Sequence, residues 1–353
     1  MTLPALLFPF LAAAGLSALL VPVARRLALM WGVVAKPGGR HVHAQPTPKL
    51  GGLAVAGSFF VVVGAVLLLD PSRLQFVNES VLGIDRNLVG VLLGGFILVI
   101  TGMVDDHYNL NPWTKLALQT VAVLMVSAFG VRIWWVSNPF GGLDIVIGNW
   151  TYLLVPLWLL LMINVMNWFD GLDGLTSGLS SIASIAIVFL SLQPFVSQPA
   201  TALLAAIVAG AALGFLPFNW HPAKIFLGDT GSMFLGFIIG VFAIISGAKF
   251  ATAALVLGIP IFDAVWVVSR RWLTGQSLMR GDRLHLHHRF LDAGFSPRTT
   301  VLILYSVAAA FGLVALKSST EGKVTALSWL ITFMLLLGIT LVIAKQKRQR
   351  RSA

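Results

Sequence analysis

Eleven stretches of this chain are apolar for long enough to cross a lipid bilayer, and no other feature constrains its fold as strongly. Hydrophobic residues make up 58% of the 353 residues and charged residues only 10%, which excludes an ordinary soluble domain. The predicted spans are residues 4–24, 52–69, 88–104, 115–130, 151–168, 174–193, 200–218, 232–248, 250–269, 300–316 and 324–344. We therefore predict an all-α integral membrane protein, a polytopic bundle of about 11 transmembrane helices that forms a single domain over residues 1–353.

The distribution of lysine and arginine predicts the orientation of this bundle. When the connection 25–51 is placed inside, 18 of the 24 basic residues lie on the inner side, as the positive-inside rule requires. The N-terminus is then outside, and the basic tail 345–353 lies in the cytoplasm, where it can bind anionic membrane lipids. The net charge of +11 is explained in this way, so we expect no nucleic-acid partner. We also expect no cleavable signal peptide, because the first apolar run has no basic segment before it.

Five polar clusters interrupt the apolar sequence, and all five fall on the predicted inner side. They are 40–52, Asp105-Asp106, the Asn164-to-Asp173 series, 228–232 and 285–289. Ionisable side chains at the edge of the hydrocarbon cost free energy unless they are paired or used. The chain has no cysteine, so thiolate metal sites and disulfides are excluded. We predict that these clusters meet at one site for a charged ligand.

The pair Asp105-Asp106 follows the third span directly. Two adjacent carboxylates at a membrane boundary can hold a divalent cation or accept a proton, but they can also be a solvated loop and a helix N-cap. Lys115 opens the next span and supplies a positive charge suited to a phosphate.

Asn164, Asn167, Asp170 and Asp173 recur at every third residue at the inner end of the fifth span. This spacing keeps successive side chains close together on a helix face. Asparagine and aspartate at a helix end are often caps, but four of them in register favour a functional role.

The segment Gly228-Asp229-Thr230-Gly231-Ser232 precedes the eighth span. Its small residues can leave backbone N–H groups free to meet an anion at a helix start, while Asp229 can take Mg²⁺. A tight turn with an aspartate cap would have the same sequence.

His285, His287 and His288 lie in an arginine-rich inner loop. Zinc is disfavoured because no third type of ligand is nearby and the surroundings are cationic, which suits an anion better. Asp263 lies inside the ninth span, where a carboxylate either has a function or pairs with a nearby arginine.

Carboxylates suited to Mg²⁺, cationic loops and glycine-rich turns together predict phosphoryl transfer between a soluble phosphorylated substrate and a lipid. The rival classes are a transporter or lipid flippase and a membrane scaffold. A transporter places its ionisable residues near the bilayer midplane, whereas here all but Asp263 lie at span ends. A scaffold gives no reason for carboxylates and histidines to gather on one face.

Several of these segments together resemble the signatures of the polyprenyl-phosphate N-acetylhexosamine-1-phosphate transferases, in the order of that family. The matching segments are Val104-Asp105-Asp106 with Pro112, Lys115 and Gln119, the stretch from Asn164 to Leu175, Phe226 to Ser232, and His285-Leu286-His287-His288. The resemblance implies Mg²⁺-dependent transfer (with Mn²⁺ as an alternative) of a sugar-1-phosphate from a UDP-sugar to undecaprenyl phosphate, with release of UMP. It also implies a bacterial cytoplasmic (inner) membrane protein with its active site on the cytoplasmic face.

The resemblance also assigns roles to individual residues. Residues implied in catalysis are Asp105, Asp106, Lys115, Asp170 and Asp173. Residues implied in substrate binding are Lys49, Asn164, Asn167, Phe226, Gly228, Arg283, His285, His287, His288 and Arg289. The implied metal ligands are Asp229 and Asp170; Phe226 would stack on uracil, and the 283–289 loop would recognise the sugar. A lipid phosphate is already largely dianionic at neutral pH, so we expect Asp105 and Asp106 to position groups first and to abstract a proton second.

At one motif this chain departs from the pattern of one branch of the family, and this difference helps to distinguish the branches. The branch that transfers phospho-MurNAc-pentapeptide typically carries Pro-Thr-Met-Gly-Gly, where this chain has Pro46-Thr47-Pro48-Lys49-Leu50-Gly51-Gly52. We therefore expect a GlcNAc-1-phosphate transferase that primes O-antigen, enterobacterial common antigen, teichoic acid or arabinogalactan, with the phospho-MurNAc-pentapeptide transferase as the alternative. The sequence leaves open the exact UDP-sugar, the role of Lys49 and whether the chain forms a homodimer.

Overall fold

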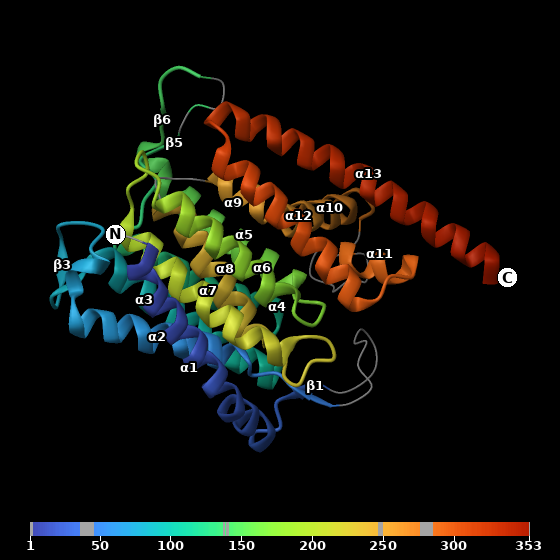
Figure 1. Ribbon diagram of the computed structural model, residues 1–353, viewed down its shortest axis with the longest axis horizontal. Helices are drawn as coiled ribbons and strands as arrows, with labels where there is room; N and C mark the ends of the chain where they lie inside the picture. The colour runs from blue at the N-terminus through green and yellow to red at the C-terminus, as the bar shows by residue number, and fades with distance from the viewer. Residues whose placement is uncertain are drawn as a thin grey trace.

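A computed structural model of the protein describes residues 3–35, 46–136, 138, 141–245, 250–275 and 285–352, and these are almost entirely helical (Figure 1). The helices are α1 (Leu3–Met30), α2 (Gly52–Leu69), α3 (Arg86–Tyr108), α4 (Pro112–Ala128), α5 (Thr151–Phe169), α6 (Leu175–Ser191), α7 (Pro199–Asn219), α8 (Gly228–Ile245), α9 (Phe250–Val256), α10 (Gly258–Leu273), α11 (Leu286–Ala293), α12 (Pro297–Lys317) and α13 (Thr320–Ser352). Two short 3-10 helices, η1 (Pro71–Leu74) and η2 (Gly148–Trp150), lie in connections.

Eight helices in the described part of the chain are long and apolar enough to cross a membrane, and α6 is a shorter apolar helix. This confirms the all-α, polytopic membrane fold. The number of eleven spans and the inside-outside orientation stay predictions.

Three two-stranded antiparallel pairs mark the two ends of the bundle. β3 (Ser80–Val81) with β4 (Ile84–Asp85), and β5 (Trp135–Val136) with β6 (Ile145–Val146), lie at the end that carries the N-terminus. β1 (Val34–Ala35) pairs with β2 (Thr47–Pro48) at the other end, which also carries α11 and the C-terminus (Figure 1). The two chain ends are therefore at opposite ends of the bundle, as an odd number of spans requires.

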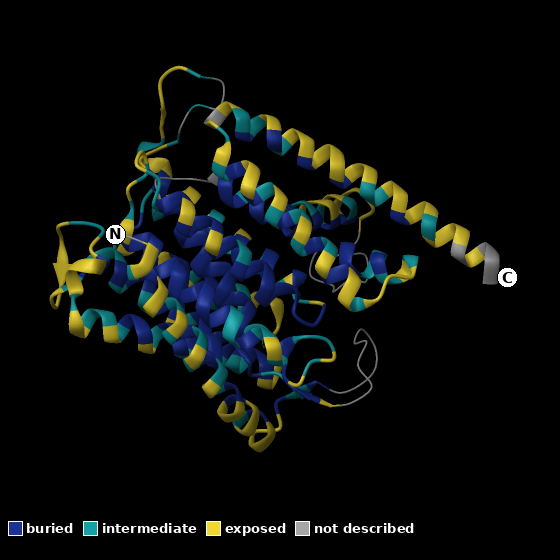
Figure 2. Ribbon diagram, in the orientation of Figure 1, coloured by how far each residue is buried: buried dark blue, intermediate teal, exposed yellow. Residues whose placement is uncertain are grey.

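Helix α8 is the central element of the bundle, and it packs against α3, α5 and α2. In its apolar window 83% of the residues are buried, against 22% in α13, and Figure 2 shows this gradient from centre to edge. Apart from Asp229 in its first turn, α8 has no charged residue, and a helix that is apolar on every side belongs in a core. The first turn of α8 is thus fixed from several directions.

The ninth predicted span, 250–269, is not one helix but two, α9 and α10, which meet at Leu257. The break follows from Pro260, which has no N–H to donate to the carbonyl of Val256 and whose ring crowds the preceding turn. The backbone resumes helical bonding beyond the proline, where Ile261 N donates to Leu257 O at 3.0 Å.

Candidate active site

A polar pocket of about 370 Å³ lies at the end of the bundle that carries β1, β2 and α11. Residues from all five predicted polar clusters line it, so the expected convergence of these clusters is confirmed. The lining residues are Ala35, Lys49, Asp105, Asp106, Asn109, Asn167, Trp168, Asp170, Gly171, Leu172, Asp173, Asn219, Phe226, Leu227, Gly228, Asp229, His285, His287 and His288.

Asp106 caps the N-terminus of α8 from the neighbouring helix α3. Its carboxylate accepts hydrogen bonds from the backbone N–H of Asp229 at 3.1 Å and from Thr230 N and Oγ1 at 3.0 and 2.8 Å. The first amides of α8 therefore bind the protein's own carboxylate, and the predicted backbone site for a substrate anion is wrong at these two amides. Because both oxygens of Asp106 are used in this way, the geometry favours a positioning role over proton abstraction.

Gly228 makes this arrangement possible. It has a φ of +72°, a left-handed conformation that side chains disfavour. A Cβ at this position would also lie 2.1 Å from the carbonyl oxygen of Lys49 and 2.6 Å from Asp106 Oδ2. Gly228 thus shapes the pocket through its backbone, because no larger residue fits between Asp106 of α3 and the backbone of Lys49.

Lys115 lies at the centre of the acidic cluster. Its Nζ is 2.7 Å from Asp105 Oδ2, 3.0 Å from Asp229 Oδ2 and 2.9 Å from Asn167 Oδ1. Asn167 in turn donates to Asp229 Oδ1 at 2.6 Å. One ammonium group therefore bridges two carboxylates, one from α3 and one from α8, and fixes the orientation of Asp229.

The remaining oxygen of Asp105 has a local role. Asp105 Oδ1 accepts the backbone N–H of Leu110 at 2.8 Å, in the turn between α3 and α4. Asp105 and Asp106 are buried in the last turns of α3, so the alternative of a solvated loop is wrong for this pair. The N-cap of α4 is Asn111 and not Asp105.

Asp170 and Asp173 lie in the loop after α5, so the predicted single helix face ends at Phe169. Desolvation of Asp170, together with the nearby carboxylates of Asp229 and Asp106, raises the pKa of Asp170 to about 8. The charged form of Asp170 is therefore disfavoured. A bound cation would stabilise that charged form, because its positive charge offsets both the desolvation and the repulsion from the other carboxylates.

Asp173 braces the loop that carries Phe226. It is buried, and its Oδ2 accepts hydrogen bonds from His221 Nδ1 at 2.7 Å and from the backbone N–H of Ala223 at 3.1 Å. Asn219 completes the brace, because it accepts from Gly174 N at 3.0 Å and donates to Ile225 O at 3.1 Å. Sequence reasoning missed His221 and Asn219, although both are polar residues at the pocket end of an apolar helix.

Within the described part of the chain, Asp263 pairs with a histidine and not with an arginine. Its Oδ2 is 2.8 Å from His285 Nδ1, and its Oδ1 accepts the backbone N–H of Leu286 at 2.7 Å. The buried carboxylate of α10 thereby fixes the start of α11, which presents the histidines to the pocket.

His287 is the buried member of the histidine cluster, with a side chain against Phe169 and Gly171. Desolvation, with His288 and His285 nearby, lowers the pKa of His287 well below its usual value, so its imidazole is neutral at pH 7. Its Nδ1 has no hydrogen-bond partner among the described residues. A buried ring nitrogen of this kind is suited to a hydrogen bond with a ligand.

Several predicted site residues lie outside the pocket lining. Lys115 does not line the pocket itself, but it contacts three residues that do, Asp105, Asp229 and Asn167. Asn164 donates to Gln119 Oε1 and to Leu160 O, both at 2.8 Å, and so faces α4. Arg289 lies on the other side of α11, with its guanidinium 6.0 Å from the centre of the Trp266 ring. Arg283 is outside the described residues, and its role stays a prediction.

The carboxylates of the pocket suit a cation that keeps part of its water. Among the described residues, no three His, Asp or Glu side chains form a complete metal cage. Mg²⁺ does not require one, because it typically binds one or two carboxylates, several waters and the phosphates of a substrate. Asp229, whose side chain is 33% exposed, and Asp170 both line the pocket and fit that mode of binding.

We expect Gly171→Ala to reduce turnover by displacing His287. An added Cβ would lie 2.1 Å from His287 Nε2, and the buried ring has little room to move. Turnover of Gly171→Ala should match that of His287→Ala. Gly64→Ala, in α2, controls for glycine loss, because no atom lies within 4 Å of its added Cβ. Normal turnover of Gly171→Ala would mean that the position of His287 is unimportant.

The fold and the pocket define a multi-pass membrane protein with one acidic, lysine-bridged site at one end of its bundle. The profile of glycosyl transferase family 4 matches residues 88–247, which include most of that site. Curated relatives match over nearly the whole chain, and the chain belongs to this family of membrane transferases.

Two relatives indicate the branch. The chain is 32% identical to the probable undecaprenyl-phosphate N-acetylglucosaminyl 1-phosphate transferase of Bacillus subtilis, over 92% of this chain and 87% of that protein. It is 36% identical to the decaprenyl-phosphate N-acetylglucosaminephosphotransferase of Mycobacterium tuberculosis, over 80% of this chain and 74% of that protein. A phospho-N-acetylmuramoyl-pentapeptide-transferase of Shouchella clausii is 31% identical, over 88% of this chain and 94% of that protein.

Proposed function

We propose that this protein transfers GlcNAc-1-phosphate from UDP-GlcNAc to undecaprenyl phosphate, with Mg²⁺ as its cofactor. UMP and a lipid-linked pyrophosphoryl sugar are the products, and the lipid primes the synthesis of a cell-envelope glycopolymer. The observation that carries this proposal is the orientation of Asp229 by Lys115 and Asn167 in a pocket that Phe226 also lines. The names of the relatives in Bacillus subtilis and Mycobacterium tuberculosis support the same donor sugar and a polyprenyl acceptor.

The proposed reaction exchanges one phosphorus–oxygen bond for another. An oxygen of the lipid phosphate bonds to the β-phosphorus, which carries the sugar, and the bond from that phosphorus to the bridging oxygen of UMP breaks. The lipid phosphate is largely dianionic at pH 7, so the attack needs little proton removal. The main barrier is the approach of two negatively charged groups, which charge neutralisation and alignment reduce.

The residues of the pocket divide this task. Asp229 and Asp170 would hold Mg²⁺, which when bound neutralises the oxygens of the pyrophosphate. Lys115 holds Asp229 and Asp105 in place, and Asp106 fixes the first turn of α8. Phe226 would stack on uracil, while the neutral His287 and its neighbours His285 and His288 would bind the sugar phosphate.

The direct test is release of UMP by the purified protein in detergent with Mg²⁺ and undecaprenyl phosphate. UDP-GlcNAc, UDP-GalNAc and UDP-MurNAc-pentapeptide are supplied in parallel, and the lipid product is identified by mass spectrometry. We expect turnover with UDP-GlcNAc and none with UDP-MurNAc-pentapeptide. Turnover only with the pentapeptide donor would support the second candidate, which the similarity to the Shouchella clausii protein keeps open.

We expect Phe226→Ala to raise the KM for the UDP-sugar by about tenfold, because stacking on a base is worth roughly 1–3 kcal/mol. The backbone of Phe226 is fixed on both sides, since its N–H donates to Pro48 O at 2.8 Å and its carbonyl accepts from Gly51 N at 2.9 Å. Truncation therefore removes the ring without releasing the loop. Phe226→Tyr keeps an aromatic face and should have a near-normal KM, and an unchanged KM in Phe226→Ala would place the uracil elsewhere.

We further propose that the protein lies in the bacterial inner membrane with its pocket on the cytoplasmic side. Support comes from the basic residues, which are concentrated at the pocket end of the bundle. Single cysteines added to this cysteine-free chain at Lys224 and Leu82, at the two ends of the bundle, can be tested in intact cells with a membrane-impermeant thiol reagent. Labelling of the Leu82→Cys variant alone is expected, and labelling of Lys224→Cys alone would reverse the orientation.

A further inference from the structure

The polar pocket contains one lysine whose ammonium group the protein does not use for its own contacts. Lys49 follows β2, is partly buried, and is the only lysine or arginine among the described residues that line the pocket. Within the described ranges, the structure gives its side chain no hydrogen bond and no ion pair. Lys115, by contrast, is fully occupied by Asp105, Asp229 and Asn167. A cation without an internal partner in a pocket is available to an anionic ligand.

The lining carboxylates do not need the charge of this lysine. Asp106 accepts hydrogen bonds from the first amides of α8, and Asp173 accepts from His221 and from the backbone N–H of Ala223. These acidic side chains are therefore held by other groups, and the ammonium of Lys49 is left for a ligand.

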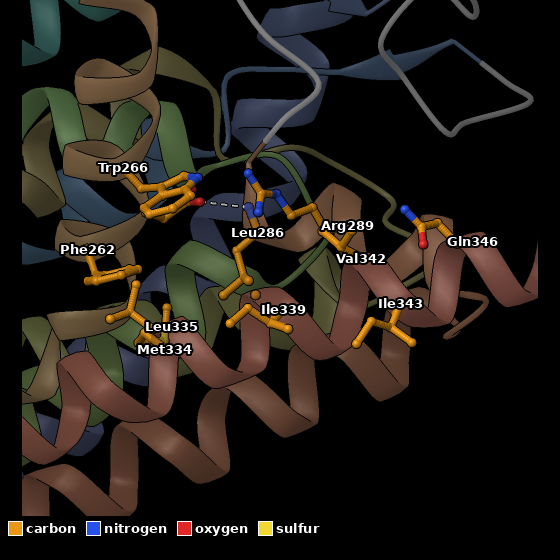
Figure 3. Close-up of a pocket in the computed structure, with 12 residues that line it drawn as sticks. Phe262, Trp266, Leu286, Arg289, Met334, Leu335, Ile339, Val342, Ile343 and Gln346 are labelled. Atoms are coloured by element: carbon orange, nitrogen blue, oxygen red, sulfur yellow. Dashed lines mark hydrogen bonds between the residues drawn. The ribbon is translucent and has the colours of Figure 1, made fainter. Parts of the chain in front are cut away.

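Arg289, which was also predicted to bind substrate, lies in a different space. It lines an apolar groove of about 410 Å³ between α10, α11 and α13, with its guanidinium 6.0 Å from the centre of the Trp266 ring (Figure 3). Of the lysine and arginine residues predicted to bind substrate, Lys49 is thus the one that the described part of the chain places in the pocket lining.

Backbone hydrogen bonds place Lys49 beside Phe226. The N–H of Lys49 donates to Val33 O at 3.1 Å, which fixes the lysine against β1. On either side of it, Pro48 O accepts from Phe226 N at 2.8 Å, and Gly51 N donates to Phe226 O at 2.9 Å. Lys49 therefore belongs to the segment that holds the proposed uracil-stacking residue in place.

The backbone of Lys49 also meets the chain between Phe226 and Asp229. An added Cβ on Gly228 would lie only 2.1 Å from the carbonyl oxygen of Lys49. In the proposed function, uracil stacks on Phe226, and a metal held by Asp229 neutralises the pyrophosphate. The α-phosphate of a UDP-sugar lies between its uridine and its β-phosphate, as Lys49 lies beside the segment that joins the two protein groups. We propose, on the basis of that function, that Lys49 binds the α-phosphate of the donor and of the UMP product.

This contact would become stronger as the proposed reaction proceeds. When the bond from the β-phosphorus to the bridging oxygen breaks, that oxygen keeps the electron pair and becomes part of the phosphate of UMP. The α-phosphate changes from a singly charged diester to a monoester that is largely dianionic at pH 7, and no proton is transferred. A fixed cation at this phosphate offsets the charge that develops on the leaving group. Lys49 keeps its proton throughout.

The test is the affinity of the full-length protein in detergent for UMP and for uridine, measured by equilibrium dialysis with excess Mg²⁺. Lys49→Met removes the charge and keeps the length of the side chain. We expect it to bind UMP about tenfold more weakly than the wild type, the size of one charge-assisted contact, and to bind uridine equally well. Its unfolding temperature without ligand should be that of the wild type, because the side chain has no partner in the described part of the chain.

Two further variants control for charge. Lys49→Arg keeps the positive charge and should restore most of the affinity for UMP. Lys224→Met removes an exposed lysine that does not line the pocket and lies two residues from Phe226, and it should bind UMP as the wild type does. An equal loss of UMP affinity in Lys49→Met and Lys224→Met would show a general effect of surface charge and would overturn the proposal.

The phosphate of the acceptor lipid is the other anion that Lys49 could bind. Stabilisation by undecaprenyl phosphate, measured as the rise in unfolding temperature, should be equal in the wild type and Lys49→Met. Loss of that stabilisation in Lys49→Met, with unchanged affinity for UMP, would assign Lys49 to the lipid phosphate and overturn the proposal. An equal loss of affinity for UMP and uridine would place Lys49 at the nucleoside and would also overturn it.

The wild type separates this proposal from the proposed function on which it rests. If the wild type binds UMP more tightly than uridine and Lys49→Met does the same to an equal degree, only the role of Lys49 is wrong. If the wild type binds neither UMP nor uridine, the proposed function is wrong and the assignment of Lys49 fails with it.

Discussion

Replacement of Asp229 by asparagine is expected to reduce turnover by about a thousandfold, because an amide removes several kcal/mol of attraction between the site and a bound metal. The side chain of Asp229 is held toward the pocket by Lys115 at 3.0 Å and by Asn167 at 2.6 Å, and asparagine has nearly the same shape. The start of α8 depends on Asp106 rather than on Asp229, so the variant should fold. Turnover is measured as UMP release over a titration of Mg²⁺.

The matched control for this change is Asp70→Asn. Asp70 is a surface aspartate beyond α2 that pairs with Arg73, and it should be neutral for turnover. Thermal unfolding of both variants in detergent checks that neither has lost its fold. If Asp229→Asn retained near-normal turnover at ordinary Mg²⁺ concentration, the metal would have to bind elsewhere in the pocket.

The convergence of the site was predictable from the sequence because every cluster is tied to the end of an apolar span. Once the spans alternate across a membrane, Asp105, Asn167, Asp229 and His285 must emerge at one end. The same logic predicted the helical fold, since a bilayer leaves few other ways to satisfy the backbone. These conclusions need only the order of polar and apolar segments.

What each side chain contacts was not predictable in this way. The cap that Asp106 forms on α8 joins residues that are far apart in the sequence, and the brace from Asp173 to His221 does the same. Arg289 was predicted to bind sugar with the histidines, but it lies outside the pocket lining, with its guanidinium 6.0 Å from the centre of the Trp266 ring. Such contacts depend on rotation and packing of helices, which local sequence does not encode.

Lys115→Met is expected to lower both turnover and stability, and Mg²⁺ should restore part of the stability. The lysine side chain is only 17% exposed, and it is the cation between Asp105 at 2.7 Å and Asp229 at 3.0 Å. Removal of one partner from a buried charge pair typically costs about 3–5 kcal/mol, and we expect the lower value because Asp229 is partly exposed. The variant should therefore unfold at a lower temperature than the wild type in a chelator.

The dependence on Mg²⁺ distinguishes charge from packing in this variant. If the lost ammonium leaves uncompensated carboxylates, a divalent cation will bind among them and raise the unfolding temperature of Lys115→Met more than that of the wild type. Turnover will still be low, because the metal cannot hold Asp229 and Asn167 in the orientation that Lys115 imposes. Lys224→Met, at an exposed lysine near the pocket, should respond to Mg²⁺ as the wild type does. An equal response in Lys115→Met would mean that the lysine acts mainly by filling space and that its charge does not organise the site.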